Sequence, residues 1–201
     1  MIFFAMSGYV LARAYDGRPA VFMARRLVRL WPVYAVVLTL GYATAGQFVP
    51  WRVLFWLPPF PRVEVDPPAW SLYWEAWATF FFPAAFWVAR RSRALAMALA
   101  GASFGLTFLH PDLVYVMFFA LGVAGSEFAI PWPQRMPGWS LWLGKISYSL
   151  YLTHAVVMRV AFSLGGPWAV AASVPAVFAA AWLIWWAVER PSIKWSRRVS
   201  W

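Results

Sequence analysis

Three ionisable side chains fall inside apolar stretches of this sequence, where a charge is costly. They are Glu75, His154 and Arg159. An ionisable group in lipid is usually retained because it binds a partner, a substrate or an ion. Most other acidic residues fall in connecting segments or at segment ends, so these three are the first candidates for chemistry.

Several interpretations of these three residues stay open. Glu75 and Arg159 have three candidate roles. They form a structural ion pair, they orient a polar substrate or a catalytic water, or they line a pathway for ions or protons. His154 carries an imidazole, which suits a general acid or base. A lone His on an apolar helix also serves as a hydrogen-bonded packing residue.

The neighbours of His154 follow a helical period. Ser147, Tyr151, His154 and Met158 recur at i, i+4, i+7 and i+11, which places them on one helix face. Polar side chains on one stripe of a membrane helix indicate a face turned to the interior or to a cavity. Hydrogen bonding between helices uses the same residue types.

A second chemical feature is the basic cluster Arg25, Arg26 and Arg29. Arg26 and Arg29 are three residues apart and share a helix face. Such a pair suits bidentate binding of phosphates, as in the diphosphate of coenzyme A. The same cluster also suits a topology anchor that touches anionic lipid.

The composition indicates that the elements carrying these residues lie in a membrane. The chain has 63% hydrophobic, 20% aromatic and only 12% charged residues, with a mean hydropathy of +0.63. Soluble domains carry roughly a quarter charged residues. The net charge of +10 fits basic residues that orient membrane helices better than it fits a nucleic-acid partner.

Several classes of site are excluded by the sequence. Cysteine is absent, so there is no disulfide framework, thiolate nucleophile or Cys-based metal site. No Gly-rich phosphate loop, zinc-ligand spacing or G-x-S-x-G elbow occurs, and we predict no metal site.

About seven apolar segments are expected to form an all-α, polytopic transmembrane bundle, because a span needs about 20 apolar residues. The expected segments are Met1–Ala12, Leu30–Ala45, Leu72–Ala89, Ala94–Leu109, Leu113–Ile130, Ile146–Leu164 and Trp168–Val188. We expect residues 1–201 to form one transmembrane domain.

The basic residues predict the orientation of these segments. If each segment crosses once with the N-terminus outside, only Arg52 and Arg62 lie in outer loops, while nearly all of the 17 basic residues lie in inner loops. This is the asymmetry of the positive-inside rule, and it predicts a cytoplasmic C-terminus. The longest outer loop, 47–71, is rich in proline, and its apolar patch Val53–Leu57 suits a short amphipathic turn in the interface.

Five motifs in order resemble the acyltransferase 3 family of membrane-bound O-acyltransferases. They are distributed over nearly the whole chain. The motifs are Ile2–Leu11 (IFFAMSGYVL), Arg25–Tyr34 (RRLVRLWPVY), Pro68–Glu75 (PAWSLYWE), Leu143–His154 (LGKISYSLYLTH) and Glu189–Pro191 (ERP).

The resemblance implies an enzyme that moves an acyl group, commonly acetyl from acetyl-CoA, to a carbohydrate hydroxyl in the inner membrane of a bacterium. It implies acyl-CoA as donor substrate, with no permanently bound cofactor, and membrane lipid and a glycoconjugate acceptor as partners. The residues implied at the donor site are Arg25, Arg26 and Arg29; those on the acceptor side are Trp70, Ser71 and Arg159; those expected near the reaction are Glu75, Tyr151 and His154.

The chain also departs from the family pattern. The family begins one helix earlier, with an arginine and, eleven positions later, a histidine taken as central to catalysis. Its paired carboxylates become Glu75-Ala76 here. We therefore expect an N-terminally incomplete member, active only in a longer form or inactive. The alternatives are a transporter that uses Glu75, Arg159 and His154, and an inert membrane subunit.

Overall fold

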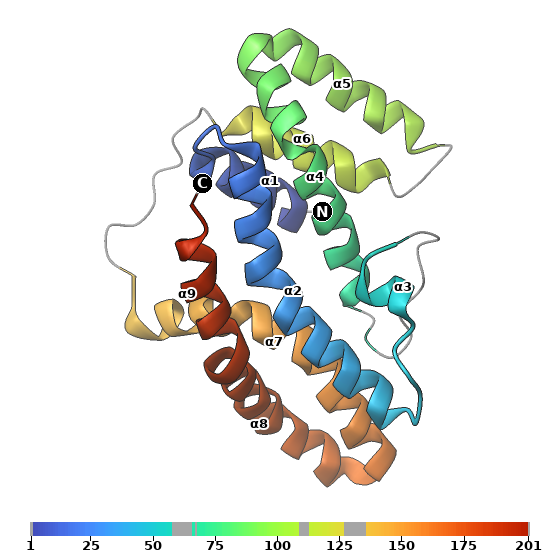
Figure 1. Cartoon of the computed structure of the whole chain (residues 1–201). Helices are drawn as coiled ribbons and strands as arrows, with labels where there is room; N and C mark the ends of the chain where they lie inside the picture. The colour runs from blue at the N-terminus through green and yellow to red at the C-terminus, as the bar shows by residue number, and fades with distance from the viewer. Residues whose placement is uncertain (1, 58–65, 67, 109–112, 127–135, 201) are drawn as a thin grey trace. The chain divides into compact units, whose positions relative to one another are not determined.

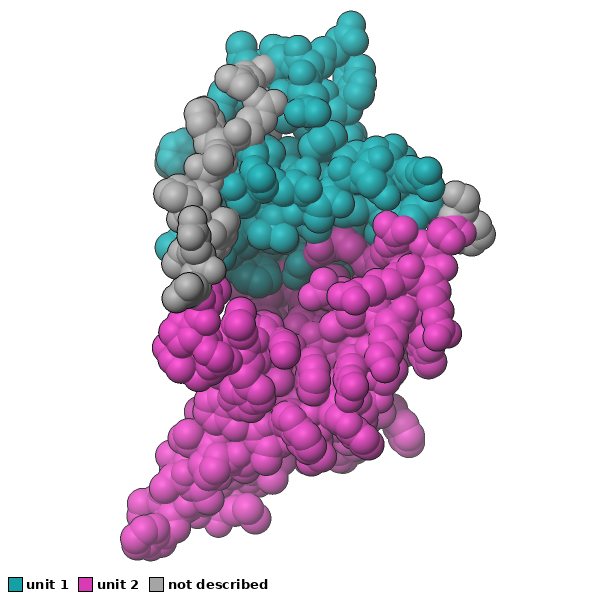
Figure 2. Space-filling model, turned by 90° about the vertical axis from the view of Figure 1, so that its left-hand side faces the viewer, with its two compact units in different colours: residues 1–23, 74–132 teal, residues 24–73, 133–201 magenta. Residues whose placement is uncertain are grey.

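The computed structural model describes all residues except 1, 58–65, 67, 109–112, 127–135 and 201. The described residues contain helices and no strand (Figure 1), which confirms the predicted all-α class for this part of the chain. The chain divides into two compact units, residues 1–23 with 74–132 and residues 24–73 with 133–201, which are coloured separately in Figure 2.

The first unit is built around an aromatic core. Its helices are α1 (Ile2–Ala14), the start of α2 (Pro19–Thr44), most of α4 (Ala69–Arg91), α5 (Arg93–Leu106) and α6 (Leu113–Gly125). Phe22 and Phe82 stack with ring centroids 4.9 Å apart. Tyr15 packs edge-on against both rings, so the turn between α1 and α2 is fixed by aromatic contacts.

Two glycines bring α1 and α6 into close contact. A Cβ on Gly8 would collide with the carbonyl oxygen of Phe119, and a Cβ on Gly122 would collide with that of Ala5. The backbones of α1 and α6 are therefore in direct contact at Gly8 and Gly122, because a glycine has no side chain to hold the helices apart. Small residues at helix crossings are typical of helix packing in membranes.

The second unit contains the longest helices of the chain. They are most of α2, α7 (Gly138–Leu164) and α8 (Gly166–Ile184), which continues through a short π-helix, η1 (Trp185–Glu189), into α9 (Arg190–Arg198). α7 and α8 lie side by side as an antiparallel pair (Figure 1). Gly165 and Gly166 make the reversal with φ of 73° and 80°, a backbone conformation that favours glycine.

A short helix, α3 (Trp51–Leu54), lies in the predicted outer loop and is tied to α2. The Tyr34 hydroxyl donates to the Val53 carbonyl at 2.8 Å, and the Trp31 indole N–H donates to the Leu54 carbonyl at 3.1 Å. Val53 is buried, while Phe55 is exposed. The expected short turn at Val53–Leu57 is therefore partly a helix, and it begins two residues earlier.

Each predicted apolar segment coincides with a helix, but several boundaries differ. α2 begins at Pro19 rather than Leu30, and α7 begins at Gly138 rather than Ile146. Both extensions carry basic or polar residues. Hydropathy excludes such residues from an apolar segment, although arginine has a high helix propensity. α6 ends at Gly125, and the remainder of the segment predicted to reach Ile130, from residue 127 on, lies outside the described residues.

Two helices in the described part of the chain are long and apolar enough to cross a membrane, by length and composition. They are Pro19–Thr44 and Gly166–Arg198, and only 17% of the most apolar window of the second is buried. Its exposed side chains include Trp168, Val174 and Leu183. Apolar exposure on this scale is typical of a surface that meets lipid or a protein partner.

The close crossing of α1 and α6 makes a prediction. Replacing Gly122 with Ala places a methyl group against the Ala5 backbone, so we expect a loss of about 1–3 kcal/mol in the free energy of unfolding. The measurement is denaturant unfolding of the detergent-solubilised protein. Gly101→Ala in α5 is the control, because a Cβ there meets nothing within 4 Å. Equal stability of the two variants would contradict the close crossing.

Candidate functional site

Two segments that are far apart in the sequence meet in the second unit. The Ser71 hydroxyl at the start of α4 lies 2.7 Å from the Tyr151 hydroxyl on α7, and either group can donate. Both hydroxyls also reach the Pro68 carbonyl, at 3.0 Å from Ser71 and 3.2 Å from Tyr151. Two hydroxyl protons can make only two of these three hydrogen bonds at a time, and each hydroxyl oxygen keeps a lone pair that can accept from another polar group.

His154 lies one turn further along α7. Its ring centroid is 6.0 Å from that of Tyr151, and its Nδ1 is 3.3 Å from the Leu150 carbonyl oxygen. A carbonyl only accepts, so this contact requires the proton on Nδ1. The neutral imidazole then carries its lone pair on Nε2, the form that a general base needs. His154 is half-buried.

The buried face of α7 differs from the predicted stripe. Ile146, Ser149, Leu152, Thr153 and Val156 are buried, whereas Ser147 and Met158 are exposed. Ser147 bonds to the Gly144 carbonyl of its own helix. The predicted stripe therefore lies on the side of α7 opposite the buried face, because residues two apart on a helix point about 200° apart. Tyr151 and His154 on this side are half-buried, and the expectation that the stripe faces the interior is wrong for Ser147 and Met158.

The three predicted donor-site arginines lie on α2 and differ in their surroundings. Arg25 Nε donates to the Val199 carbonyl at 3.0 Å, so this side chain satisfies an end of α9. Arg26 is half-buried and Arg29 is exposed. Of the three, Arg29 has the geometry most open to a phosphate of a donor substrate.

Glu189 is a residue that sequence reasoning did not assign to the site. Only 2% of it is exposed, and the fully buried Ser149 donates to its Oε2 at 2.5 Å. Arg29 lies close enough for Coulombic attraction to this carboxylate. Glu189 closes the π-helix Trp185–Glu189, a local structure that is frequent at functional sites.

A sequence signal for Glu189 did exist. It is an acid at the end of an apolar segment, directly followed by Arg190 and Pro191, and we used it only for the family resemblance. Because a buried carboxylate needs partners, the Ser149 hydrogen bond links the π-helix to α7, while Arg29 on α2 adds a Coulombic attraction.

Asp66 is a second buried acid that the sequence did not single out. It has 0% exposure, and within the described part of the chain neither carboxylate oxygen has a hydrogen bond. Its backbone carbonyl accepts from the Ala69 amide, so Asp66 lies in the turn that leads into α4 and Ser71. Burial raises the pKa of Asp66 to about 7.

In the first unit, Glu75 meets the start of the chain. The Ser7 hydroxyl donates to Glu75 Oε1 at 3.3 Å, and Glu75 is buried. This contact joins α1 to α4, beside the Gly8 crossing. It gives Glu75 a partner from the first of the five motifs.

The remaining predicted residues are distributed as follows. Trp70 on α4 is partly exposed beside Ser71, and Arg159 near the end of α7 is exposed. Glu75 and Arg159 belong to different units, so their ion pair stays a prediction. No three metal-binding side chains of the described residues lie together.

Comparisons with known proteins give no family for this chain. No protein-family model, no curated protein and no solved structure matches it. Function is therefore inferred from the residues and their contacts.

The buried carboxylate of Asp66 predicts a pH dependence of stability. Its pKa in the folded protein is about 7, against 3.8 for the ordinary group. Between these values the unfolded chain has lost the proton that the folded chain holds, so stability falls as pH rises through this window. The slope is at most about 1.4 kcal/mol per pH unit.

Asp66→Asn should remove this contribution and make the protein more stable than wild type at pH 8. The measurement is the midpoint of thermal unfolding at pH 5 and pH 8. Asp16→Asn, at an exposed aspartate, is the matched control and should keep the wild-type pH dependence. If Asp66→Asn were less stable than wild type at pH 8, the carboxylate would have a native partner.

Proposed function

We propose that this chain belongs to a polytopic membrane O-acyltransferase, which transfers an acyl group, acetyl in our proposal, from acyl-CoA to a carbohydrate hydroxyl. The observation that carries the proposal is the hydrogen bond between Ser71 and Tyr151. It unites two of the motifs that resemble the acyltransferase 3 family. The contact between Ser7 and Glu75 unites two motif residues in the first unit in the same way.

The proposed membrane arrangement has seven spans, with the N-terminus outside and the C-terminus in the cytoplasm. The apolar helices Pro19–Thr44 and Gly166–Arg198 support a membrane location, and the basic loops support the orientation. In this arrangement Arg29 and Glu189 lie toward the inner side, and the outer loop that carries Trp70 and Ser71 folds back along α2 and α7 to reach Tyr151.

In the proposed reaction, a sugar hydroxyl attacks the carbonyl carbon of the acyl thioester. The new C–O bond forms, the C–S bond breaks, and the hydroxyl proton passes by way of a base to the released CoA thiolate. Donor phosphates are held by Arg26 and Arg29, with Glu189 positioning Arg29. Ser71 and Tyr151 bind the acceptor, Glu75 orients it, and His154 Nε2 is an auxiliary proton acceptor.

The orientation can be tested with single cysteines, because the native chain has none. We expect Gln47→Cys and Ser163→Cys to react with a membrane-impermeant maleimide in intact cells. Gln47 lies in a proposed outer loop, Ser163 lies at the proposed outer end of α7, and both are exposed. Ser200→Cys should react only after the membrane is opened. The measurement is the gel shift of the labelled protein.

The reverse labelling pattern would contradict the orientation. Labelling of all three positions in intact cells would contradict the span count.

The donor site predicts a loss of affinity in one variant. Arg29→Ala should weaken acetyl-CoA binding by about 1.5–3 kcal/mol, the scale of a hydrogen bond to a charged group. The measurement is equilibrium binding of labelled acetyl-CoA to the purified protein. Arg52→Ala is the control, since Arg52 is exposed and packs on Trp51 in the outer loop. Unchanged affinity in Arg29→Ala would remove the donor assignment.

A further inference from the structure

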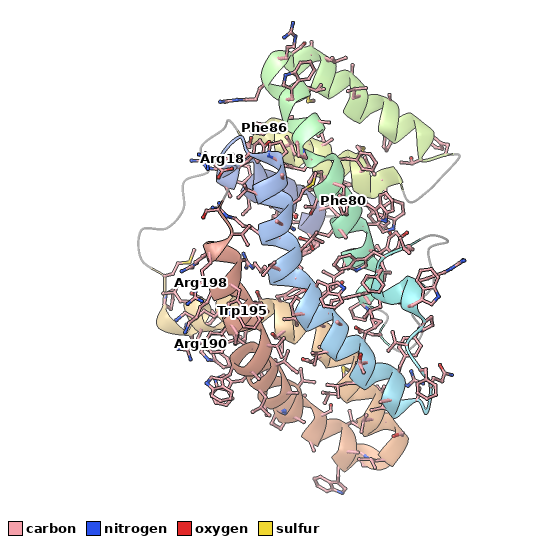
Figure 3. All side chains as sticks on the ribbon, viewed as in Figure 1. Arg18, Phe80, Phe86, Arg190, Trp195 and Arg198 are labelled. Atoms are coloured by element: carbon pink, nitrogen blue, oxygen red, sulfur yellow. The ribbon has the colours of Figure 1, made fainter. Side chains whose placement is uncertain are left out.

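The last helix of the chain carries a one-sided basic surface. On α9 the exposed cations are Arg190, Lys194, Arg197 and Arg198. At 100° per residue they share an arc of about 100°. The opposite face is made of Ser192 and Ser196, which are buried. Arg190, Trp195 and Arg198 are labelled along this helix in Figure 3.

These cations have no surface carboxylate to neutralise them within the described part of their unit. The carboxylates of that part are Asp66 and Glu189, and both are buried. Four like charges at helical spacing repel one another, which destabilises the helix unless an anion lies against it. The charge pattern therefore points to an anionic partner outside the unit.

The position of α9 identifies the partner. It continues without interruption from α8, and the whole run Gly166–Arg198 is 33 residues long. At 1.5 Å per residue this run is about 50 Å, whereas the hydrocarbon layer of a bilayer is about 30 Å thick. The apolar part begins at Gly166, so the charged end reaches the headgroup layer.

An exposed tryptophan adds a second indication of the same layer. Trp195 is 58% exposed and flanks the basic arc, between the cations and the buried serines. An indole prefers the depth of the headgroups, where its ring is partly in lipid and its N–H reaches polar groups. Cations with a neighbouring tryptophan fit a lipid surface better than a single phosphate ligand.

We propose that α9 is a binding surface for anionic phospholipid, with Lys194, Arg197 and their neighbours against the phosphates and Trp195 at the interface. The proposal rests on the membrane location and is independent of acyl transfer. Arg25 supports it by holding the C-terminal carbonyl of Val199, which fixes the end of this helix. The expected partner is phosphatidylglycerol or another lipid of net negative charge.

The test is lipid titration of the purified full chain in detergent, read as the midpoint of thermal unfolding. We expect phosphatidylglycerol to raise this midpoint and phosphatidylcholine to leave it nearly unchanged. In K194Q/R197Q the phosphatidylglycerol concentration for half of the effect should rise at least tenfold, since two cations near an anionic surface are worth roughly 30-fold.

The comparison variant is R90Q/R91Q, which removes the same charge from the exposed end of α4. We expect a smaller shift there than in K194Q/R197Q, because these two arginines do not belong to the arc of four cations on α9. Equal responses of K194Q/R197Q and wild type would overturn the proposal. An equal effect of phosphatidylcholine, or of inorganic phosphate without lipid, would also overturn it. Recovery of the chain in the soluble fraction without detergent would instead refute the membrane location itself.

Discussion

Polar groups that are removed from water must find partners inside the protein, and this constraint organises the described contacts of the chain. Ser149 and Glu189 are both buried, and their 2.5 Å hydrogen bond joins α7 to the π-helix that follows α8. Ser71 and Tyr151 satisfy one another and the Pro68 carbonyl in the same way. Each hydrogen bond joins segments that are distant in sequence, so these polar residues determine which apolar helices pack together.

The same constraint gives physical reasons for the residues that resemble family motifs. In the first motif, Gly8 allows α1 to touch α6 while the adjacent Ser7 reaches Glu75. In the fourth motif, Tyr148 donates to the Leu30 carbonyl at 2.8 Å and holds α7 against α2. Tyr151, one turn later, reaches Ser71. Two tyrosines that look equivalent in the sequence thus have different tasks, one in packing and one in the candidate site.

The sequence predicted the helices well because apolar runs and proline or glycine boundaries are local signals. It predicted α2 and α7 too short, since the apolar segments stop at Arg29 and Lys145 while the helices continue beyond them to Pro19 and Gly138. The family resemblance indicated Tyr151 and Ser71 as site residues. The hydrogen bond between them is a tertiary contact, which cannot be predicted from the spacing of residues in the sequence. Glu189 and Asp66 were missed for the same reason: a carboxylate at a segment end or in a proline-rich turn looks solvated until its burial is known.

The central claim is that Tyr151 belongs to an acceptor site of an acyltransferase. The most direct measurement is transfer of a labelled acetyl group from acetyl-CoA to membrane glycan, in membranes that contain the wild-type chain, Tyr151→Phe or Tyr148→Phe. The account predicts transfer by wild type, a large loss in Tyr151→Phe with a raised KM for the acceptor, and a smaller loss in Tyr148→Phe. Absence of transfer by wild type, or equal activity of Tyr151→Phe and wild type, would contradict it.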